Sequence, residues 1–391
     1  MESLRIAILT ETLPAAELTL QPWRYLGNLA QALQGAGHDA VVVTSEQGPQ
    51  VWNGIPVERH RARDDFRYAS GLRRIVRSVS GQAGLFRLTA TLFFSMRRTP
   101  ADGRQAESLV GVFLRPLHDG RTLVRRFLDP TLAPEARLDV HHAGLYLSRI
   151  LGTWPSAASQ VDRFVFLWDA DRARAVRAGL PAEACSFIRH PFDPFFLERG
   201  PPKLGPRLSD LLKTVERRVM FTGPPEETRG VDDVLRLARY LPVDRPTQVV
   251  LLLRDARYRD PAVTRSRIGP HEVLIVRGFL SREELRAAYR ASHAAVFPYR
   301  FVRTALPLVV LEAVATGLPV AVTRVHPIRE LETKTGLVFA KVRDPRDLAR
   351  AVQQMFDEGM RAEALRKNQE WIRSSPDWSA VASTFAALVQ R

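Results

Sequence analysis

The stretch RFVRTALPLVVLEAVATGLPV, residues 300–320, carries the clearest pattern in the chain. It predicts a loop, then a helix over 307–316, then a new strand after Gly317. A loop that ends at a helix N-terminus presents free backbone N–H groups, which form a ready site for a diphosphate. Glu312 lies on this otherwise apolar helix, where a buried carboxylate needs hydrogen-bond donors. The two hydroxyls of a ribose would supply them, and pairing with a nearby arginine is the alternative.

Short apolar strands alternate with amphipathic helical patterns on both sides of the chain's midpoint. In the first half, a strand at 5–10, a helix at 22–36 and a strand at 40–44 form a βαβ unit. Residues 192–206 are rich in proline and glycine and predict a linker. We therefore predict an α/β protein with two doubly wound domains, which bind ligands at the carboxyl ends of their strands. In the second half, strands are predicted at 218–221, 248–252, 273–276, 294–297, 319–322 and 337–339, and further helices at 231–240, 282–291 and 345–358.

Length and composition fit this organisation. A chain of 391 residues suits two domains, and its 45% hydrophobic and 25% charged residues are ordinary for a globular protein. The one cysteine, Cys185, excludes an intrachain disulfide and a cysteine-rich metal site. The start shows no signal-peptide pattern, and no apolar run approaches the ~20 residues of a membrane span. We expect a cytoplasmic protein.

The net charge of +15 favours phosphate-bearing ligands or an anionic membrane surface, unless it is simply a solvated basic surface. Nucleic acid is not expected as a partner, because the arginines are spread over both halves of the chain. Residues 67–101 contain no acidic side chain. A helix lying on the inner membrane face or over an acceptor would have this pattern, and so would a domain helix with arginines along its edge.

Several segments, taken together, resemble one known family. Residues 312–313 and 317–320 are similar to the second half of the signature of retaining glycosyltransferases with the GT-B fold, family 4 (glycosyl transferases group 1). The resemblance implies two Rossmann-like domains that face each other across a cleft. It places an acceptor-side domain at 1–195, a nucleotide-sugar-binding domain at 205–375 and a closing helix at 376–391 that packs back on the first domain. Further similar segments are 5–44, 161–165, 179–183, 190–193, 278–285 and 294–298.

The resemblance also implies a function and a site. It implies retaining, hexosyltransferase-like transfer from a nucleotide-diphosphate sugar to a glycan, lipid-linked or other acceptor, with no metal and no other cofactor. The donor nucleotide is expected at Gly223, Arg229, Arg303, Ala305, Leu306, Pro307, Leu308 and Glu312. The acceptor side is expected at Pro14, Ala15 and Arg24, and the catalytic candidates are His141, His142 and Thr304. Adjacent histidines in a strand point to opposite sides, so at most one of the pair faces the cleft.

Some positions depart from the family pattern. Thr304 stands where the family's first glutamate approaches the transferred sugar, and Pro224 stands where it has a phosphate-clamp arginine. Arg229 stands in for the clamp lysine. Arg300 and Arg303 could replace the lost arginine or could be ordinary surface residues. The alternative function is a catalytically weakened glycosyltransferase-like scaffold that binds a nucleotide, glycan or nucleic acid. A Rossmann oxidoreductase is not expected, because no Gly-x-Gly-x-x-Gly follows a strand.

Overall fold

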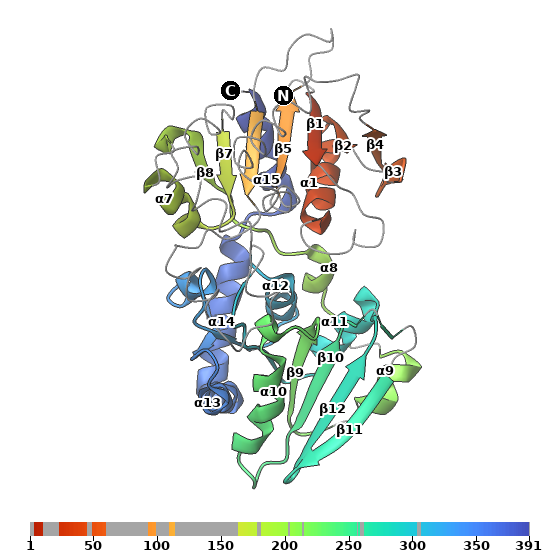
Figure 1. The fold of residues 1–391 in the computed structure, drawn as a ribbon, viewed down its shortest axis with the longest axis vertical. Coiled ribbons are helices and arrows are strands. Elements are labelled where there is room, and N and C mark those ends of the chain that lie inside the picture. The colour runs from red at the N-terminus through yellow and green to blue at the C-terminus, as the bar shows by residue number, and fades with distance from the viewer. Residues whose placement is uncertain are drawn as a thin grey trace, which may run out of the picture. The chain divides into compact units, whose positions relative to one another are not determined.

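A computed structural model describes most of the second half of the chain and parts of the first (Figure 1). Two compact units are formed, one from Met1–Pro191 and Pro376–Arg391 and the other from Phe192–Val302 and Leu306–Ser375. The residues described are 4–10, 23–44, 49–59, 93–98, 109–113, 163–177, 181–201, 204–212, 215–255, 257–258, 262–302 and 306–390.

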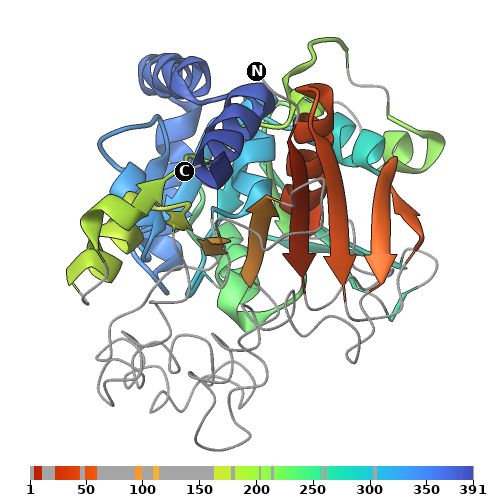
Figure 2. The same ribbon diagram turned by 90° about the horizontal axis from the view of Figure 1, so that it is seen from above.

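The sheet of the first unit has the strand order β3-β4-β2-β1-β5-β6-β7-β8. Strands β1, β2 and β4 are parallel and run side by side in Figure 2. Strand β5 is antiparallel to both of its neighbours, β1 and β6. The bounds are β1 (Arg5–Thr10), β2 (Asp39–Thr44), β3 (Val51–Trp52), β4 (Ile55–Arg59), β5 (Phe93–Arg98), β6 (Leu109–Phe113), β7 (Arg163–Phe166) and β8 (Cys185–Phe187).

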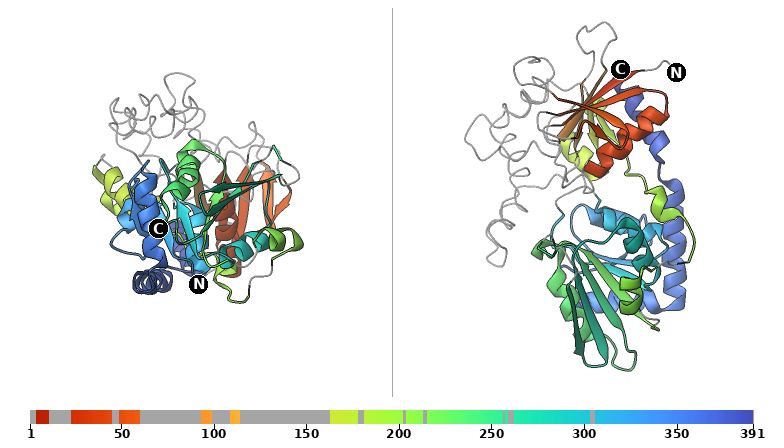
Figure 3. Two further views of the ribbon diagram at one scale, coloured as in Figure 1. Left: turned by 90° about the horizontal axis from the view of Figure 1, so that it is seen from below. Right: turned by 90° about the vertical axis from the view of Figure 1, so that its right-hand side faces the viewer.

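Two helices from opposite ends of the chain build the core of this unit. α1 (Trp23–Gly35) and α15 (Trp378–Gln390) contact each other and lie side by side in the right-hand view of Figure 3. Leu26, Leu29 and Leu33 follow the helical repeat on α1 and are almost fully buried with Phe385 of α15. The closing helix therefore belongs to the first unit. Three further elements are α7 (Asp169–Arg177), the 3₁₀ turn η4 (Ala182–Ala184) and the strand β8 that follows it.

The sheet of the second unit has the order β11-β12-β10-β9-β13-β14-β15, and every pairing is parallel except β11 with β12. Its inner strands are continuous apolar runs, and every residue of β9, β10, β13 and β14 is buried. This is what a sheet covered on both faces requires. The bounds are β9 (Arg218–Gly223), β10 (Gln248–Leu253), β11 (Ala262–Ile268), β12 (His271–Arg277), β13 (Ala294–Phe297), β14 (Val320–Thr323) and β15 (Val338–Ala340).

Helices cover both faces of this second sheet, and α10 and α11 lie on opposite sides of it in Figure 3. Their starts follow from the sequence: Ser281 and Glu284 form a capping box on α11, and Asp344 and Asp357 cap α13 and α14. The bounds are α8 (Pro194–Leu197), α9 (Pro206–Leu211), η5 (Glu227–Arg229), α10 (Val231–Leu237), η6 (Ala238–Tyr240), α11 (Arg282–Arg290), α12 (Leu308–Ala315), η7 (Ile328–Leu331), α13 (Pro345–Phe356) and α14 (Glu358–Ser374).

The α/β fold class is confirmed, but the linker prediction for 192–206 is wrong. Those residues belong to the second unit, and Phe196 of α8 is fully buried. Arg282 of α11 donates to Asp193 at 2.6 Å, and Arg286 donates to the carbonyl of Phe195 at 2.8 Å. Proline starts short helices here instead of breaking the chain into a linker.

Candidate functional site

The order of the strands in the second sheet indicates where a ligand is expected to bind. β9 lies between β10 and β13, so the chain winds outward in one direction from β9 and in the other from β13. Doubly wound sheets bind ligands at such a switch point, outside the carboxyl ends of the strands. β9 ends at Gly223 and β13 ends at Phe297. The loops that follow these two residues therefore form the candidate site.

The two loops are fastened to each other. The backbone N–H groups of Arg300 and Phe301 both donate to the carbonyl of Thr228, at 2.9 and 3.2 Å. Gly230 has φ 71°, and a Cβ added to it would lie 2.0 Å from the carbonyl oxygen of Pro298. Only glycine fits there, because it tolerates the left-handed conformation and lets the two backbones touch. The loop after β9 is therefore held in one place.

Arg229 lies at the end of η5 and is oriented by an aromatic ring. Its Nη1 donates to the hydroxyl of Tyr299 at 3.2 Å, and its Cζ lies 5.2 Å from the centre of that ring. The Nε of Arg229 also lies 3.7 Å from the Oε2 of Glu226. Burial raises the pKa of Tyr299, although Arg229 opposes that rise. The phenol is therefore neutral at physiological pH and acts as a fixed support for the guanidinium.

Arg300 follows Tyr299 in the chain, and its guanidinium forms ion pairs with carboxylates of the same unit. It bonds both carboxylate oxygens of Asp233, at 3.0 and 3.1 Å, and Glu227 at 3.2 Å. Its side chain is 11% exposed and that of Asp233 is 3% exposed. These ion pairs disfavour the hypothesis that Arg300 replaces the missing clamp arginine. It ties the loop after β13 to α10 and to η5.

Glu312 lies in the middle of α12 and is 4% exposed. Its neighbours along the helix, Leu311 and Ala313, are buried as well. The negative charge of Glu312 contributes to the raised pKa of Tyr299, after the larger effect of burial. Glu312 and Arg229 therefore act electrostatically on the same phenol. We call these three electrostatically coupled residues the Arg229–Tyr299–Glu312 cluster.

The predicted donor residues that the structure describes all lie in the second unit. Leu306 is buried, Pro307 is the N-cap residue of α12, and Leu308 is its first helical residue. Arg24, predicted on the acceptor side, lies on α1 in the first unit and is half-buried. The other predicted residues lie outside the described part of the chain: Pro14, Ala15, His141, His142, Arg303, Thr304 and Ala305.

Sequence reasoning missed Tyr299. An aromatic residue two positions beyond the end of β13 carries no sequence signal of its own, because the cation that it supports lies 70 residues away along the chain. Within the described ranges, no three or more His, Cys, Asp or Glu side chains are grouped so that they could hold a metal ion. Among these residues, none of the helices combines the length and the apolar character of a bilayer-spanning segment.

Comparison with known proteins agrees with this architecture. Residues 216–358 match the family "Glycosyl transferases group 1". A curated glycogen synthase from Mycobacterium tuberculosis is 27% identical over 182 residues, which are 45% of this chain and 43% of that protein. The match thus spans less than half of the length of that relative.

Solved structures share the fold over nearly the whole chain. HepE of Anabaena, determined in complex with UDP and glucose, has a TM-score of 0.57 at 13% identity and covers 98% of both chains. The α,α-trehalose 6-phosphate synthase of Burkholderia multivorans has a TM-score of 0.62 at 14% identity and covers 100% of this chain and 98% of its own. Residues 216–358 are therefore similar to the glycosyl transferases group 1 family, and the fold of the chain is GT-B.

Proposed function

We propose that the chain is a retaining glycosyltransferase that moves a sugar from a nucleotide-diphosphate sugar to a glycan, lipid-linked or other acceptor. The observation that carries this proposal is the Arg229–Tyr299–Glu312 cluster at the switch point of the second sheet. It offers one oriented cation and one buried carboxylate, the two groups that a nucleoside diphosphate needs for its phosphates and its ribose.

The diphosphate is assigned to Arg229 and to the start of α12. A guanidinium held against a ring face is restrained, so less side-chain freedom is lost when a phosphate binds. The backbone N–H groups of Leu308 and Val309 open α12 and lie at its positive dipole end, whereas the N–H of Val310 already donates to the carbonyl of Pro307. Both features stabilise the negative charge that grows on the leaving diphosphate during transfer, which is an electrostatic form of catalysis.

The ribose is assigned to Glu312. A carboxylate accepts hydrogen bonds from two neighbouring hydroxyls, and low exposure strengthens each of these bonds. HepE was determined with UDP and glucose, which supports a UDP-sugar as the first donor to test. The acceptor residues Pro14, Ala15 and Arg24, and the catalytic candidates His141, His142 and Thr304, stay predictions. The roles of Arg303 and Ala305 at the donor site also stay predictions. So do the absence of a metal requirement, the cytoplasmic location and the contact with the inner membrane face.

A thermal-shift screen followed by an activity assay tests this function. At a concentration of 100 times Kd, a ligand of the folded state adds about 2.7 kcal/mol of stability, so at least one nucleoside diphosphate should raise Tm by several degrees. A panel of UDP-, GDP- and ADP-sugars then identifies the donor through release of its nucleotide. If no nucleotide shifts Tm while nucleic acid does so in a salt-dependent way, the chain is the weakened scaffold instead.

A further inference from the structure

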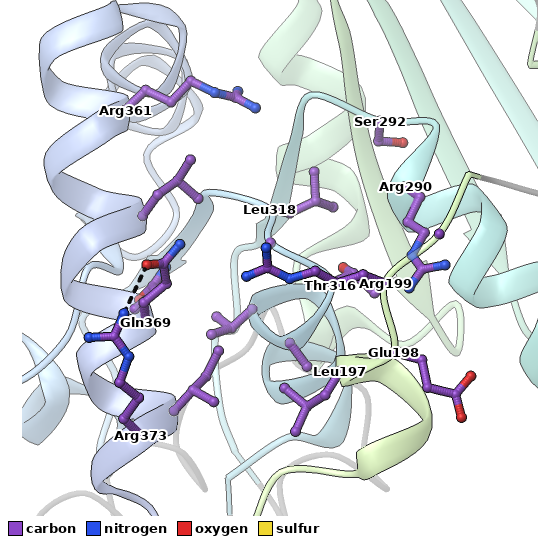
Figure 4. Close-up of a pocket in the computed structure, with 17 residues that line it drawn as sticks. Leu197, Glu198, Arg199, Arg290, Ser292, Thr316, Leu318, Arg361, Gln369 and Arg373 are labelled. Atoms are coloured by element: carbon purple, nitrogen blue, oxygen red, sulfur yellow. Dashed lines mark hydrogen bonds between the residues drawn. The ribbon is translucent and has the colours of Figure 1, made fainter.

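A cavity lies at the amino ends of the strands of the second sheet. This cavity of about 620 Å³ is enclosed between α14, the segment after α8 and the turn that joins α12 to β14 (Figure 4). Ser292, which precedes β13, and Leu318, which precedes β14, both line it. These residues mark the amino ends of the strands, whereas the Arg229–Tyr299–Glu312 cluster lies at their carboxyl ends. The proposed donor site therefore leaves this cavity unused.

Four arginines and only one carboxylate are among the residues that line the cavity. They are Arg199, Arg290, Arg361 and Arg373, and the carboxylate is Glu198. In Figure 4 Arg361 reaches out from α14, and Arg199 extends toward that helix from the opposite wall. Glu198 is already ion-paired with Arg286 at 2.5 Å. The side chains around this cavity thus carry an excess of positive charge.

Two of these cations are held half-buried. Burial lowers the pKa of both Arg290 and Arg361, and for Arg290 the charge of Arg286 lowers it further while that of Glu198 raises it. Arg361 donates to the carbonyl of His293 at 2.7 Å. Within the described ranges, no carboxylate lies within ion-pair distance of Arg199, Arg290 or Arg361. Charges in this state are stabilised when an anion joins them.

An unsatisfied donor in the wall gives an independent indication. Asn368 lines the cavity and is 2% exposed. Its Oδ1 accepts from the backbone N–H of Gly336 at 2.9 Å, which fixes the orientation of the amide. Its Nδ2 is buried and has no hydrogen-bond partner. A buried amide donor without a partner is destabilising, and an anionic oxygen would satisfy it.

The end of α12 does not oppose an anion at this place. A helix C-terminus carries partial negative charge on its last carbonyls. Here the carbonyls of Glu312, Ala313 and Val314 accept from the backbone N–H groups of Thr316, Leu318 and Gly317. The hydroxyl of Thr316 also donates to Ala313 at 2.8 Å. These bonds satisfy the carbonyls, so the arginines dominate the field in the cavity.

We propose that this cavity binds a small phosphorylated anion through Arg199, Arg290, Arg361 and the Nδ2 of Asn368. Inorganic pyrophosphate is the probe, and isothermal titration calorimetry with the full chain at low ionic strength is the measurement. Arg199→Gln combined with Arg290→Gln should weaken binding about tenfold or more, because two charge-assisted hydrogen bonds are lost. Asn368→Asp keeps the acceptor for Gly336 and replaces the donor by a negative oxygen, so it should abolish binding.

Two controls separate this site from its alternatives. Arg366→Gln removes a cation from the same helix that is paired with Glu363 and Glu370 and does not line the cavity, so it should change affinity less than twofold. Because the proposed donor site would also bind pyrophosphate, the double variant is measured in an Arg229→Gln background, in which only this cavity should bind the probe. Pyrophosphate binding that is absent in Arg229→Gln alone, or that survives when Arg199→Gln and Arg290→Gln are added to Arg229→Gln, overturns the proposal. Sedimentation with phosphatidylglycerol vesicles distinguishes the source of the phosphate: vesicle binding that the double variant abolishes assigns a lipid headgroup, and pyrophosphate binding alone assigns a soluble ligand.

Discussion

Arg229 lies over the ring of Tyr299 and donates to its hydroxyl at 3.2 Å, so the cation proposed to bind the diphosphate is oriented before any ligand arrives. Tyr299→Phe keeps the ring and removes only that hydroxyl. We expect affinity for a nucleoside diphosphate to fall about fivefold, since one hydrogen bond to the guanidinium contributes about 1 kcal/mol. Calorimetry measures this, with Tyr240→Phe on the exposed end of η6 as the control. Equal affinities for the wild-type chain and Tyr299→Phe would show that this contact does not position Arg229.

Arg300 is expected to act on stability rather than on catalysis. Arg300→Gln leaves the carboxylate of Asp233 buried without its bidentate partner, which should lower the free energy of unfolding by about 3–5 kcal/mol. Arg366→Gln breaks ion pairs whose members are about half exposed and should cost less than about 1 kcal/mol. Urea denaturation compares the two. Adding Asp233→Asn to Arg300→Gln should recover part of the loss, and a loss from Arg300→Gln no larger than that of the control would refute the buried-pair account.

Replacing Gly230 by alanine should destabilise the protein, and the same change at Gly269 serves as the control. Gly230 and Gly269 both have positive φ, at 71° and 58°, but nothing lies within 4 Å of a Cβ added at Gly269. Gly269→Ala should therefore cost only the left-handed strain of about 1–2 kcal/mol. Gly230→Ala adds a collision with Pro298 and should cost distinctly more, with weakened nucleotide binding. Thermal melts compare the loss of Tm in Gly230→Ala with that in Gly269→Ala. Similar losses of Tm would contradict the close approach of the two loops.

Two histidines give the second unit a pH dependence of known sign. The Nδ1 atoms of His271 and His293 accept from the backbone N–H groups of Thr247 and Arg218, so both rings need an unprotonated Nδ1. Burial lowers the pKa of His271 below its ordinary value of 6.5. Burial does the same to His293, with a contribution from the charges of Arg218 and Arg361. The unfolded chain therefore binds more protons as pH falls through about 6.5, and stability must fall with it.

Substitution of these histidines tests the origin of that slope. His271→Asn and His293→Asn each keep an acceptor near the position of Nδ1 and cannot titrate in this range. Urea unfolding at pH 7.5 and pH 5.5 should show a smaller loss of stability on acidification for each variant than for the wild-type chain. An unchanged loss in both variants would assign the pH dependence to other groups.

Most of the second unit follows from local sequence. The apolar runs of β9, β10, β13 and β14 are buried on both faces, so each predicts its strand to within a few residues. β11 escaped prediction because its side chains are mostly exposed, and only its pairing with β12 makes it a strand. α14 escaped because few of its residues are buried and its pattern follows directly on that of α13.

Part of the candidate site could be predicted from the sequence. The rest depends on contacts between residues that are far apart in the chain. Glu312 could be singled out because a carboxylate on an apolar helix needs hydrogen-bond donors, whereas Arg229 was indicated only by its place in the clamp motif of the family that the sequence resembles. The role of Arg300 could not be found, because Asp233 lies 67 residues away along the chain and is brought near only by the fold. Tyr299 supports Arg229 across 70 residues for the same reason.

The measurement that tests the central claim most directly is a comparison of two ligands on two proteins. Calorimetry of UDP, or of the nucleotide that the thermal screen selects, and of its 2′,3′-dideoxy analogue is carried out with the wild-type chain and with Glu312→Gln. If Glu312 accepts from the ribose hydroxyls, the wild-type chain should prefer the natural nucleotide by about tenfold or more, and Glu312→Gln should lose most of that preference. An equal preference in both proteins would contradict the assignment of the ribose to Glu312.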